Sequence, residues 1–387
     1  MNFIYLSPHF PPNYYQFSVH LKNLGVNVLG IADEPYDLLQ PDLRSALTEY
    51  FQVTDMHDYD QLIRACGYFT YKYGKIDRID SHNEYWLNTE AHLRKAFDIV
   101  GPKDLDILKM QRKSEMKKFF SKAGVHVARG KIVHTKHDAQ KLIDEIGYPV
   151  VAKPNRGVGA AKTYKIHNEF ELRQFFNTKP QVNYMLEEFV TGKIYTFDGL
   201  TDQDGVPVFY TSHTYSQGIM ETVNEDLLIY YYSLREIPQD LETAGLSVVK
   251  AYQLRERFFH FEFFRSDRDN QIVGLEVNMR PPGGLTTDMF NYANDIDIYK
   301  EWANIVVHNS FSTSYYRPYH CCYISRKSNK RYSYTHEDIL TVFKEQIVHY
   351  EPISGIFSAA LGDFGYLARS PNLDEIIAIA EFIQKTE

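Results

Sequence analysis

The sequence predicts a mixed fold, in which a parallel α/β unit is followed by α+β parts with antiparallel sheets. Two observations predict it. Over the first 100 residues short apolar strands alternate with helical stretches, as in parallel βαβ units. From residue 185 to residue 278 strand patterns follow one another with turn residues between them, as in an antiparallel sheet with some helix. The length of 387 residues allows two or three domains at a prior of about 150 residues each.

Composition narrows the class of protein. Hydrophobic residues make up 44% of the chain and charged residues 24%, which is typical of a globular protein. The net charge of −8 lacks the basic excess that binding to a phosphate backbone needs, so no nucleic-acid partner is expected. Three cysteines without a paired pattern favour a reducing compartment. No apolar run approaches about 20 residues, and the first residues lack a signal-peptide pattern, so we expect a cytoplasmic protein with no membrane partner.

The first elements predict where ligands gather. Strands are expected over residues 2–7, 26–32 and 76–81, with helices over 15–24 and 58–72. In parallel sheets, ligands bind at the carboxyl ends of strands, and the segments SPHFPPNYYQ and SHNEYW follow two of these strands. Asn83 and Glu84 in the second segment are therefore candidate substrate contacts. The alternative is that both segments are ordinary connecting loops.

The rest of the chain continues this pattern. Lys109 to Lys122 is expected to be one helix that ends at Gly124, a natural C-terminal cap. His213, Tyr215 and His308 are expected to pack or to face solvent. The remaining expected elements are strands over 130–133, 148–154, 195–202, 205–213, 260–265, 272–278 and 319–325, and helices over 138–146, 338–346 and 373–385.

A lysine and a small-residue loop follow one apolar strand, in the segment VVAKPNRGVGAAKTY. Lys153 ends the strand, and Gly157 and Gly159 lie in the loop. Small residues let backbone N–H groups approach a phosphate closely, and the lysine adds positive charge. The segment thus predicts a phosphate site, although it matches neither common glycine-rich phosphate motif and can also be read as a plain turn.

A short extended connection in MLEEFVTGKIYTFDG predicts an adenine contact. The segment passes from one strand to the next with only Thr191 and Gly192 as turn formers. Exposed main-chain groups in such a hinge can donate to and accept from an adenine ring, with an aromatic side chain packed nearby. Phe189 or Met185 is the candidate for this packing. The alternative is an edge strand with no ligand.

Two carboxylates in HFEFFRSDRDNQIVGLEVNMRPPGG predict a metal site. Glu262 and Glu276 each lie seven residues from Asp269 in the turn, so a hairpin centred there brings them face to face. Like charges make this unfavourable unless a cation lies between them. Asn278 shares the face of Glu276 by strand alternation and adds a third oxygen ligand. Oxygen ligands without His or Cys suit Mg²⁺. The alternative is a solvated charged face.

An arginine follows the candidate metal ligands directly. Arg280 precedes the rigid turn Pro281 to Gly284, which can present its guanidinium beside a metal. A guanidinium matches phosphate oxygens in a bidentate manner. The alternative is an arginine that faces solvent.

Taken in this order, these segments resemble the ATP-grasp superfamily of carboxylate–amine ligases, over about residues 1 to 310. The resemblance implies a Rossmann-like N-terminal domain and two α+β subdomains that hold ATP between them. It implies that Lys113, eleven residues before Gly124, and Lys153 bind phosphates, and that Glu187 to Val190 bind adenine. It also implies that Glu262, Glu276 and Asn278 bind Mg²⁺, with Mn²⁺ as an alternative ion, and that Arg280 holds the transferred phosphate.

The resemblance has two departures. The family usually carries Gly-x-Glu after the hinge, with the glutamate on the ribose, whereas this chain reads Gly192-Lys193-Ile194. In the position of an oxyanion-binding arginine, two residues before the first metal acid, this chain has His260, which becomes a candidate substrate contact.

The implied organisation and activity follow. The expected units are a Rossmann-like domain (1–105), one subdomain with the glycine loop (106–184), one with the hinge and metal site (185–310), and a C-terminal α/β extension (311–387). The implied reaction joins a small carboxylate to an amine through an acyl phosphate and releases ADP, in a homodimeric enzyme with Arg280 and Lys153 as catalytic residues. The alternatives are a carboxylase-like or thiol-ligase-like enzyme with a non-amine acceptor, and a nucleotide-binding regulator without turnover.

Overall fold

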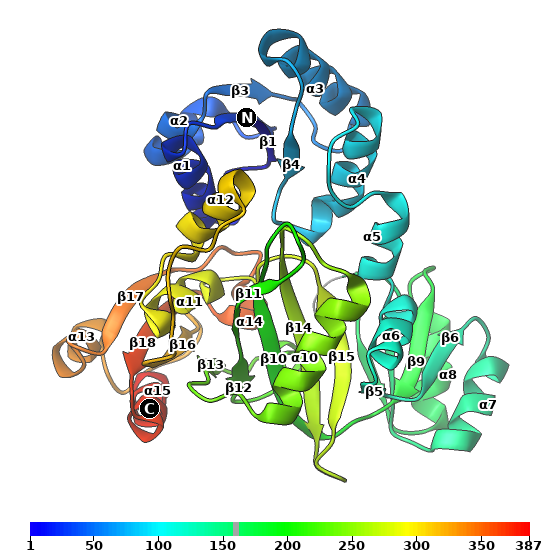
Figure 1. Cartoon of the computed structure of the whole chain (residues 1–387). Helices are drawn as coiled ribbons and strands as arrows, with labels where there is room; N and C mark the ends of the chain where they lie inside the picture. Colours follow the sequence, from blue (N-terminus) through cyan, green and yellow to red (C-terminus); the bar gives the residue numbers. More distant parts are fainter. Residues whose placement is uncertain (158–161) are drawn as a thin grey trace.

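The computed structural model describes residues 1–157 and 162–387, and the strands of these residues form three sheets (Figure 1). The first is the expected parallel sheet, with strand order β3-β2-β1-β4. Its strands are β1 (Asn2–Leu6), β2 (Asn27–Ala32), β3 (Glu49–Gln52) and β4 (Arg78–Asp80). Its helices are η1 (Pro12–Tyr14), α1 (Tyr15–Asn23), η2 (Tyr36–Leu38), α2 (Pro41–Ala46), α3 (Tyr59–Tyr73), η3 (Glu84–Trp86) and α4 (Leu87–Ala96).

Strand alternation explains why helices cover both faces of this sheet. Phe3 and Tyr5 of β1 pack on one face with α1, and Ile4 and Leu6 pack on the other face with α3 and α4. The first face is also covered by α12 (Ile298–His308), a helix from much later in the chain that lies beside α1 in Figure 1. The N-terminal layer therefore needs residues beyond 285, which the expected division at residue 105 does not include.

The second sheet is small and antiparallel, with strand order β6-β9-β7-β8. Its elements are β6 (Gly130–Val133), α7 (Lys136–Ile146), β7 (Val150–Pro154), β8 (Tyr164–Ile166), α8 (Glu169–Thr178) and β9 (Tyr184–Glu188). Val150, Ala152 and Leu186 face the two helices in an apolar cluster. The alternate residues Lys153 and Glu187 face the opposite way. The expected boundary at residue 185 falls within β9, which pairs with β6 and β7 on its two sides.

The third sheet is the largest, with strand order β17-β18-β16-β13-β12-β10-β14-β15-β5 and β11 paired beside β10. The strands are β5 (His126–Val127), β10 (Gly192–Thr201), β11 (Pro207–Thr211), β12 (His213–Tyr215), β13 (Tyr230–Ser233), β14 (Arg257–Ser266), β15 (Ile272–Asn278), β16 (His320–Arg326), β17 (Ile347–Pro352) and β18 (Phe364–Ser370). The C-terminal strands continue this sheet through β13 and β16, so residues 311–387 share it with the hinge and the hairpin.

Helices cover the apolar faces of this sheet. They are α5 (Asp104–Gln111), α6 (Lys113–Lys122), α10 (Gln239–Tyr252), α11 (Thr286–Asn294), α13 (His336–Val342), α14 (Ser358–Leu361) and α15 (Leu373–Gln384). The short helix α9 (Ile219–Asn224) lies between β12 and β13 in the sequence and contacts α14. The single helix expected over Lys109 to Lys122 is divided at Arg112. The reason is a long-range contact: the Lys113 N–H donates to the Asn155 carbonyl (2.8 Å), which places Lys113 at the start of α6.

One negative finding concerns membranes. Among the helices of residues 1–157 and 162–387, none has both the length and the apolar character needed to cross a bilayer.

Candidate active site

A cavity of about 610 Å³ lies between the second sheet, called the small sheet below, and the third sheet, called the central sheet below. Its volume is within the usual range for small-molecule sites, roughly 300 to 1,000 Å³. The lining residues come from both sheets and from the segment after β12. The sequence-predicted residues among them are Lys113, Lys153, Glu187, Glu188, Phe189, Val190, His260, Glu262, Glu276, Asn278 and Arg280.

The expected pairing of the two carboxylates is confirmed. Glu262 lies directly opposite Glu276 on the neighbouring strand, and His260 lies opposite Asn278. Across the other side of β14, Thr196 is the partner of Glu262, and Asp198 is the partner of His260. Two polar rows therefore run across β10, β14 and β15.

The residues between these rows face the other way. Phe197, Phe261 and Val277 form the intervening cross-strand row and are fully buried in the core beneath α6 and α10. The polar face of the hairpin is thus fixed by the burial of the apolar one.

Lys113 neutralises one of the two carboxylates. Its Nζ lies 2.6 Å from Glu276 Oε1 and also donates to the Gly157 carbonyl at 3.0 Å. Burial lowers the pKa of Lys113, but Glu276 outweighs burial and raises the pKa above its ordinary value. An ammonium group that is 163 residues away in sequence is therefore held beside a predicted metal ligand.

Lys153 is held in the same way by Glu187. The Glu187 carboxylate pairs with Lys153 Nζ and, at 2.7 Å, with Lys117 Nζ. Burial raises the pKa of Glu187, but the two ammonium groups outweigh burial and lower it. The main chain of Glu187 pairs with Gly130 and Val151 on its two sides. The main chain of Glu187 thus lies inside the small sheet, and the expected adenine contact of this residue stays a prediction.

The rest of the predicted hinge begins where β9 ends. The Glu188 carboxylate pairs with the Arg129 guanidinium (2.7 Å), and the backbone N–H of Glu188 donates to the Arg129 carbonyl. The ammonium nitrogen of Lys165 lies over the ring of Phe189, 3.7 Å from the ring centroid. The segment Phe189 to Thr191 therefore remains as the extended connection that faces the cavity.

A buried Asp–His network lies behind the metal candidates and was missed in the sequence. Asp198 is fully buried and bonds His213 Nδ1 at 2.8 Å and His260 Nδ1 at 2.6 Å. His260 Nε2 lies 3.6 Å from Glu262 Oε1. Burial lowers the pKa of His260, but Asp198 and Glu262 outweigh burial and raise the pKa to about 9. The signal was strand alternation: Thr196 and Asp198 share the face that the register brings to Glu262 and His260.

Tyr215 was also discounted in the sequence, yet it lines the cavity with the following residues Ser216 to Glu221. No local motif marks this segment. It reaches the cavity because β12 pairs with β10 in the central sheet.

The loop at the carboxyl end of β1 contacts residues that follow Arg280, and Glu84 of the loop after β4 is buried nearby. Tyr14 donates to the Pro282 carbonyl at 3.1 Å, and Asn13 donates to Asp288 at 2.7 Å. Burial and the charge of Glu276 raise the pKa of Glu84 to about 7, while Arg280 opposes them. Within the described residues, Glu84 Oε2 is buried without a hydrogen-bond partner.

Asn83 has a different position from the one expected. Its side chain accepts from the Tyr85 N–H at 3.0 Å and so caps the short helix η3. Neither Asn83 nor Glu84 lines the cavity itself. Of the predicted glycines, Gly157 contacts Lys113, and Gly159 lies outside the described residues.

Comparison with known sequences finds a domain match and several relatives for part of the chain. Residues 146–288 match the sequence profile of the ATP-grasp domain. The chain is 25% identical over 252 residues to an L-arginine-specific L-amino acid ligase from Bacillus subtilis, which covers 61% of this chain and 59% of that protein. It is 27% identical over 200 residues to the arginine-specific carbamoyl phosphate synthase large chain of Bacillus subtilis (strain 168), covering 50% of this chain and 19% of that protein. The aligned region thus spans less than two thirds of either relative.

Solved structures give the fold over the whole chain. An L-amino acid ligase from Bacillus licheniformis superposes with a TM-score of 0.71 at 14% identity, covering 98% of this chain and 96% of that one. An N5-carboxyaminoimidazole synthetase from Staphylococcus aureus complexed with ADP gives 0.72 at 14% identity, covering 97% and 95%. This chain therefore has the fold of these ATP-grasp enzymes, and its residues 146–288 match the ATP-grasp domain.

Proposed function

We propose that this protein is an ATP-dependent ligase that joins a carboxylate to an amine through an acyl phosphate and releases ADP and phosphate. One observation supports it most directly. The polar rows that carry Glu262, Glu276 and Asn278 face the same cavity as Lys113 and Lys153. Phosphoryl transfer needs mainly positioning and charge neutralisation, and these groups offer both.

The donor set fits Mg²⁺. Two carboxylates and an amide oxygen are hard oxygen ligands, and Mg²⁺ commonly takes only one or two carboxylates plus substrate phosphates. Glu276 is balanced here by Lys113, and Glu262 lies near His260, so the carboxylates already attract positive charge. Among the described residues no group of three or more His, Cys, Asp and Glu is placed to hold a metal, so a protein cage of the zinc type does not compete with this assignment. Mn²⁺ suits the same ligands.

The chain's own residues take distinct roles in this proposal. Lys113 and Lys153 hold the phosphates of ATP together with backbone groups at Gly157, and Phe189 and Val190 pack the adenine beside Glu187 and Glu188. Glu262, Glu276 and Asn278 hold Mg²⁺, which when bound neutralises the transferred phosphoryl group. Arg280 binds the γ-phosphate and then the acyl phosphate with its guanidinium fork.

The substrates are proposed to lie beside Arg280, next to the loops that follow β1 and β4. Glu84 is the candidate contact for the amine, because its Oε2 is buried and, among the described residues, has no hydrogen-bond partner. The relatives named as L-amino acid ligases make L-amino acids the first class to test. A homodimer is the proposed assembly, and light scattering on the purified protein tests it.

The experiment is a screen for ADP release. The protein is incubated with Mg-ATP and with each of the twenty proteinogenic L-amino acids, alone and in pairs, and ADP and amide products are measured by chromatography and mass spectrometry. We expect ADP and an amide in equal amounts with at least one pair. ADP without an amide would favour a non-amine acceptor. Nucleotide binding without ADP release would contradict the proposal and favour a regulator.

A further inference from the structure

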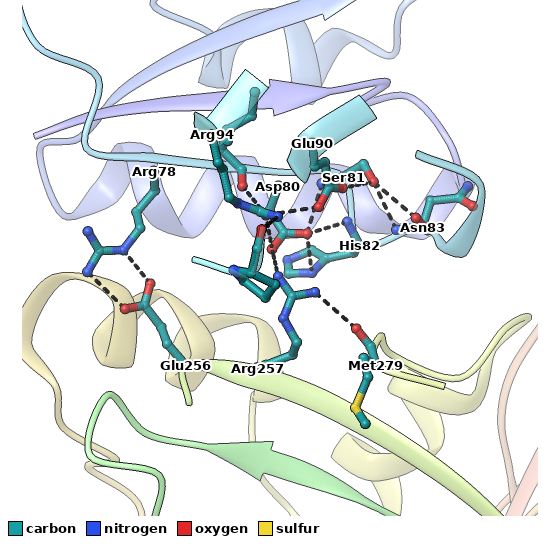
Figure 2. Close-up of polar contacts among 12 residues, drawn as sticks. Arg78, Asp80, Ser81, His82, Asn83, Glu90, Arg94, Glu256, Arg257 and Met279 are labelled. Atoms are coloured by element: carbon teal, nitrogen blue, oxygen red, sulfur yellow. Dashed lines mark hydrogen bonds and ion pairs between the residues drawn. The ribbon is translucent and has the colours of Figure 1, made fainter. Parts of the chain in front are cut away.

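Two segments that approach the cavity from different sheets are joined by one side chain. The loop Asp80 to Glu84 follows β4 of the parallel sheet, and Asn278 to Arg280 ends β15 of the central sheet. Arg257, the first residue of β14, contacts both segments. Its Nη2 donates to Asp80 Oδ2 at 3.1 Å, and its Nη1 donates to the Met279 carbonyl at 3.0 Å (Figure 2).

The loop after β4 is fixed by its own hydrogen bonds. Asp80 Oδ1 accepts from the N–H groups of Ser81 (2.9 Å) and His82 (2.8 Å). His82 has a φ of +55°, in the left-handed region that few residues other than glycine adopt, and these bonds hold it there. Its ring packs against Phe17 and Trp302, with centroids 4.3 and 4.6 Å apart. The loop is therefore held rigidly against the parallel sheet and the helices that cover it.

The ion pair between Glu90 and Arg94 also holds the loop Asp80 to Glu84 in place. Glu90 is fully buried and accepts from Ser81 N at 2.9 Å and from Arg94 Nη2 at 2.9 Å. Arg94 also lies 3.5 Å from Asp80. Burial raises the pKa of Asp80, but Arg257, His82 and Arg94 outweigh burial and keep the pKa below its ordinary range. Asp80 therefore stays charged as the partner of Arg257.

The other end of the bridge lies between two proposed active-site residues. Met279 is fully buried in the core of the central sheet, with Asn278 before it and Arg280 after it. A carbonyl held at this point fixes the backbone from which both polar side chains leave. Arg257 can make both bonds because its guanidinium presents several donors in one rigid plane, which a lysine ammonium does not.

We propose that Arg257 is a positioning residue that sets the place of the loop carrying Glu84 relative to the segment carrying Asn278 and Arg280, so that the amine rather than water reacts with the acyl phosphate. This inference rests on the proposed function. In the ligation step the amine nitrogen forms a bond to the acyl carbon, and the bond from that carbon to the phosphate oxygen breaks. Phosphate leaves with the electron pair of that bond, and the proton that the amine loses ends on the phosphate. When water reacts instead, the carboxylate and phosphate form, and ATP is consumed without an amide.

The structure offers a matched control in the same interface. Arg78 of β4 pairs with Glu256, the residue before Arg257, through Nε (2.7 Å) and Nη2 (2.9 Å), as Figure 2 shows. This pair joins β4 to the residue before β14, and among the described residues the Arg78 side chain donates to Glu256 and the Asp77 carbonyl but not to Met279. If Arg257 only helped to hold the two layers together, Arg78→Met and Arg257→Met would have similar effects.

The experiment compares four variants with the wild type: Arg257→Lys, Arg257→Met, Asp80→Asn and Arg78→Met. Each is given Mg-ATP and the mixture of twenty L-amino acids, and the ratio of ADP to amide is measured. We expect a ratio near that of the wild type for Arg78→Met and a rise of roughly 10- to 100-fold for Arg257→Met, since a misplacement of about 1 Å in the reacting groups can change rates by about 100-fold. Arg257→Lys and Asp80→Asn, which keep part of the bridge, should lie between. An unchanged ratio in both Arg257 variants would overturn the proposal.

Hydrogen exchange on the ligand-free variants gives a second readout. We expect faster exchange in peptides covering residues 80–84 and 278–285 for the Arg257 variants, and exchange as in the wild type for Arg78→Met. If the wild type forms no amide at all, the proposed function fails, and the step assigned to Arg257 fails with it. The exchange result then decides separately whether Arg257 positions the two segments. Equal exchange in the Arg257 and Arg78 variants would contradict that positioning.

Discussion

Glu276 and Lys113 form a largely buried ion pair at the wall of the cavity, with 2.6 Å between Oε1 and Nζ. This pair changes what is expected of the two facing carboxylates. From the sequence alone, removal of one negative charge relieves repulsion between Glu262 and Glu276. In the structure it also leaves a buried ammonium group without its partner, which is destabilising.

Glu276→Gln should therefore abolish Mg²⁺-dependent ADP formation and also lower the melting temperature. We expect a loss of roughly 1 to 3 kcal/mol in the free energy of unfolding, since the amide keeps a hydrogen bond to Lys113 but not the charge. Glu115→Gln, which breaks an exposed pair with Lys118, is the control. Normal turnover of Glu276→Gln at limiting Mg²⁺ would exclude the metal assignment.

Arg280→Lys tests the guanidinium fork. A lysine keeps the charge but not the bidentate geometry, so we expect kcat to fall by about 100-fold while binding of a non-hydrolysable ATP analogue changes little. The control is Arg268→Lys, in the turn between β14 and β15, which should change neither kcat nor the binding of the ATP analogue. A parallel loss of analogue affinity and kcat would show instead that Arg280 binds the ground state.

Asp198→Asn tests the support behind the metal ligands. Asp198 accepts from His213 and His260, and His260 lies beside Glu262. Groups that orient metal ligands typically change metal affinity by 10- to 100-fold, so the Mg²⁺ concentration for half-maximal activity should rise by about that factor. Asp240→Asn breaks the pair between Asp240 of α10 and Arg265, which lies on β14 as His260 and Glu262 do, and should leave the Mg²⁺ dependence unchanged. A fall in stability without a shift in Mg²⁺ dependence would make Asp198 purely structural.

Glu84→Gln should make the protein more stable and less active. Burial raises the pKa of Glu84 from 4.5 to about 7, so the folded state binds this proton more tightly than the unfolded state. Stability of the wild type therefore falls as pH rises from about 4.5 to about 7, and the variant lacks this loss. We expect equal stability at pH 4 and a gain of roughly 2 to 3 kcal/mol at pH 8.

Urea unfolding at several pH values checks this prediction, with the exposed Glu145→Gln as control. A constant difference across the pH range would contradict the cause given for it. If Glu84 contacts the amine substrate, the same variant should raise the substrate KM while ATP-analogue binding stays near normal. Asn83→Ala should cost stability alone, through loss of the η3 cap.

Local patterns predicted the hairpin well. The symmetric placement of Glu262 and Glu276 about Asp269 predicted that they face each other, and they do. The register next to the turn, with Phe263 opposite Gly274, would place Glu262 opposite Leu275, and a β-bulge between Glu262 and Phe263 brings Glu276 into that position. The sequence pattern did not predict this bulge. The information that predicts the hairpin lies within a few residues of its turn.

Long-range contacts were not predictable in the same way. The partners of Lys113 and Lys153 come from other strands, and no local spacing points to them. The division of one expected helix at Arg112 depends on Asn155, and the cover of the first sheet depends on α12. Asp198 is the exception, since its parity with Thr196 on β10 was visible in the sequence.

The place of β16 has a consequence for how the chain is made. β13, near residue 230, has β12 on one side and β16 on the other, so one edge of it stays open until residues 320–326 have been synthesised. An unpaired strand edge is prone to pair with other chains, and domains tend to fold during synthesis. If translation stalls after the hairpin of β14 and β15 and before β16, the hairpin and the hinge are complete, but the edge of β13 that pairs with β16 is still unpaired and can associate with other chains. Chaperone demand during translation should therefore persist until the last quarter of this protein has emerged.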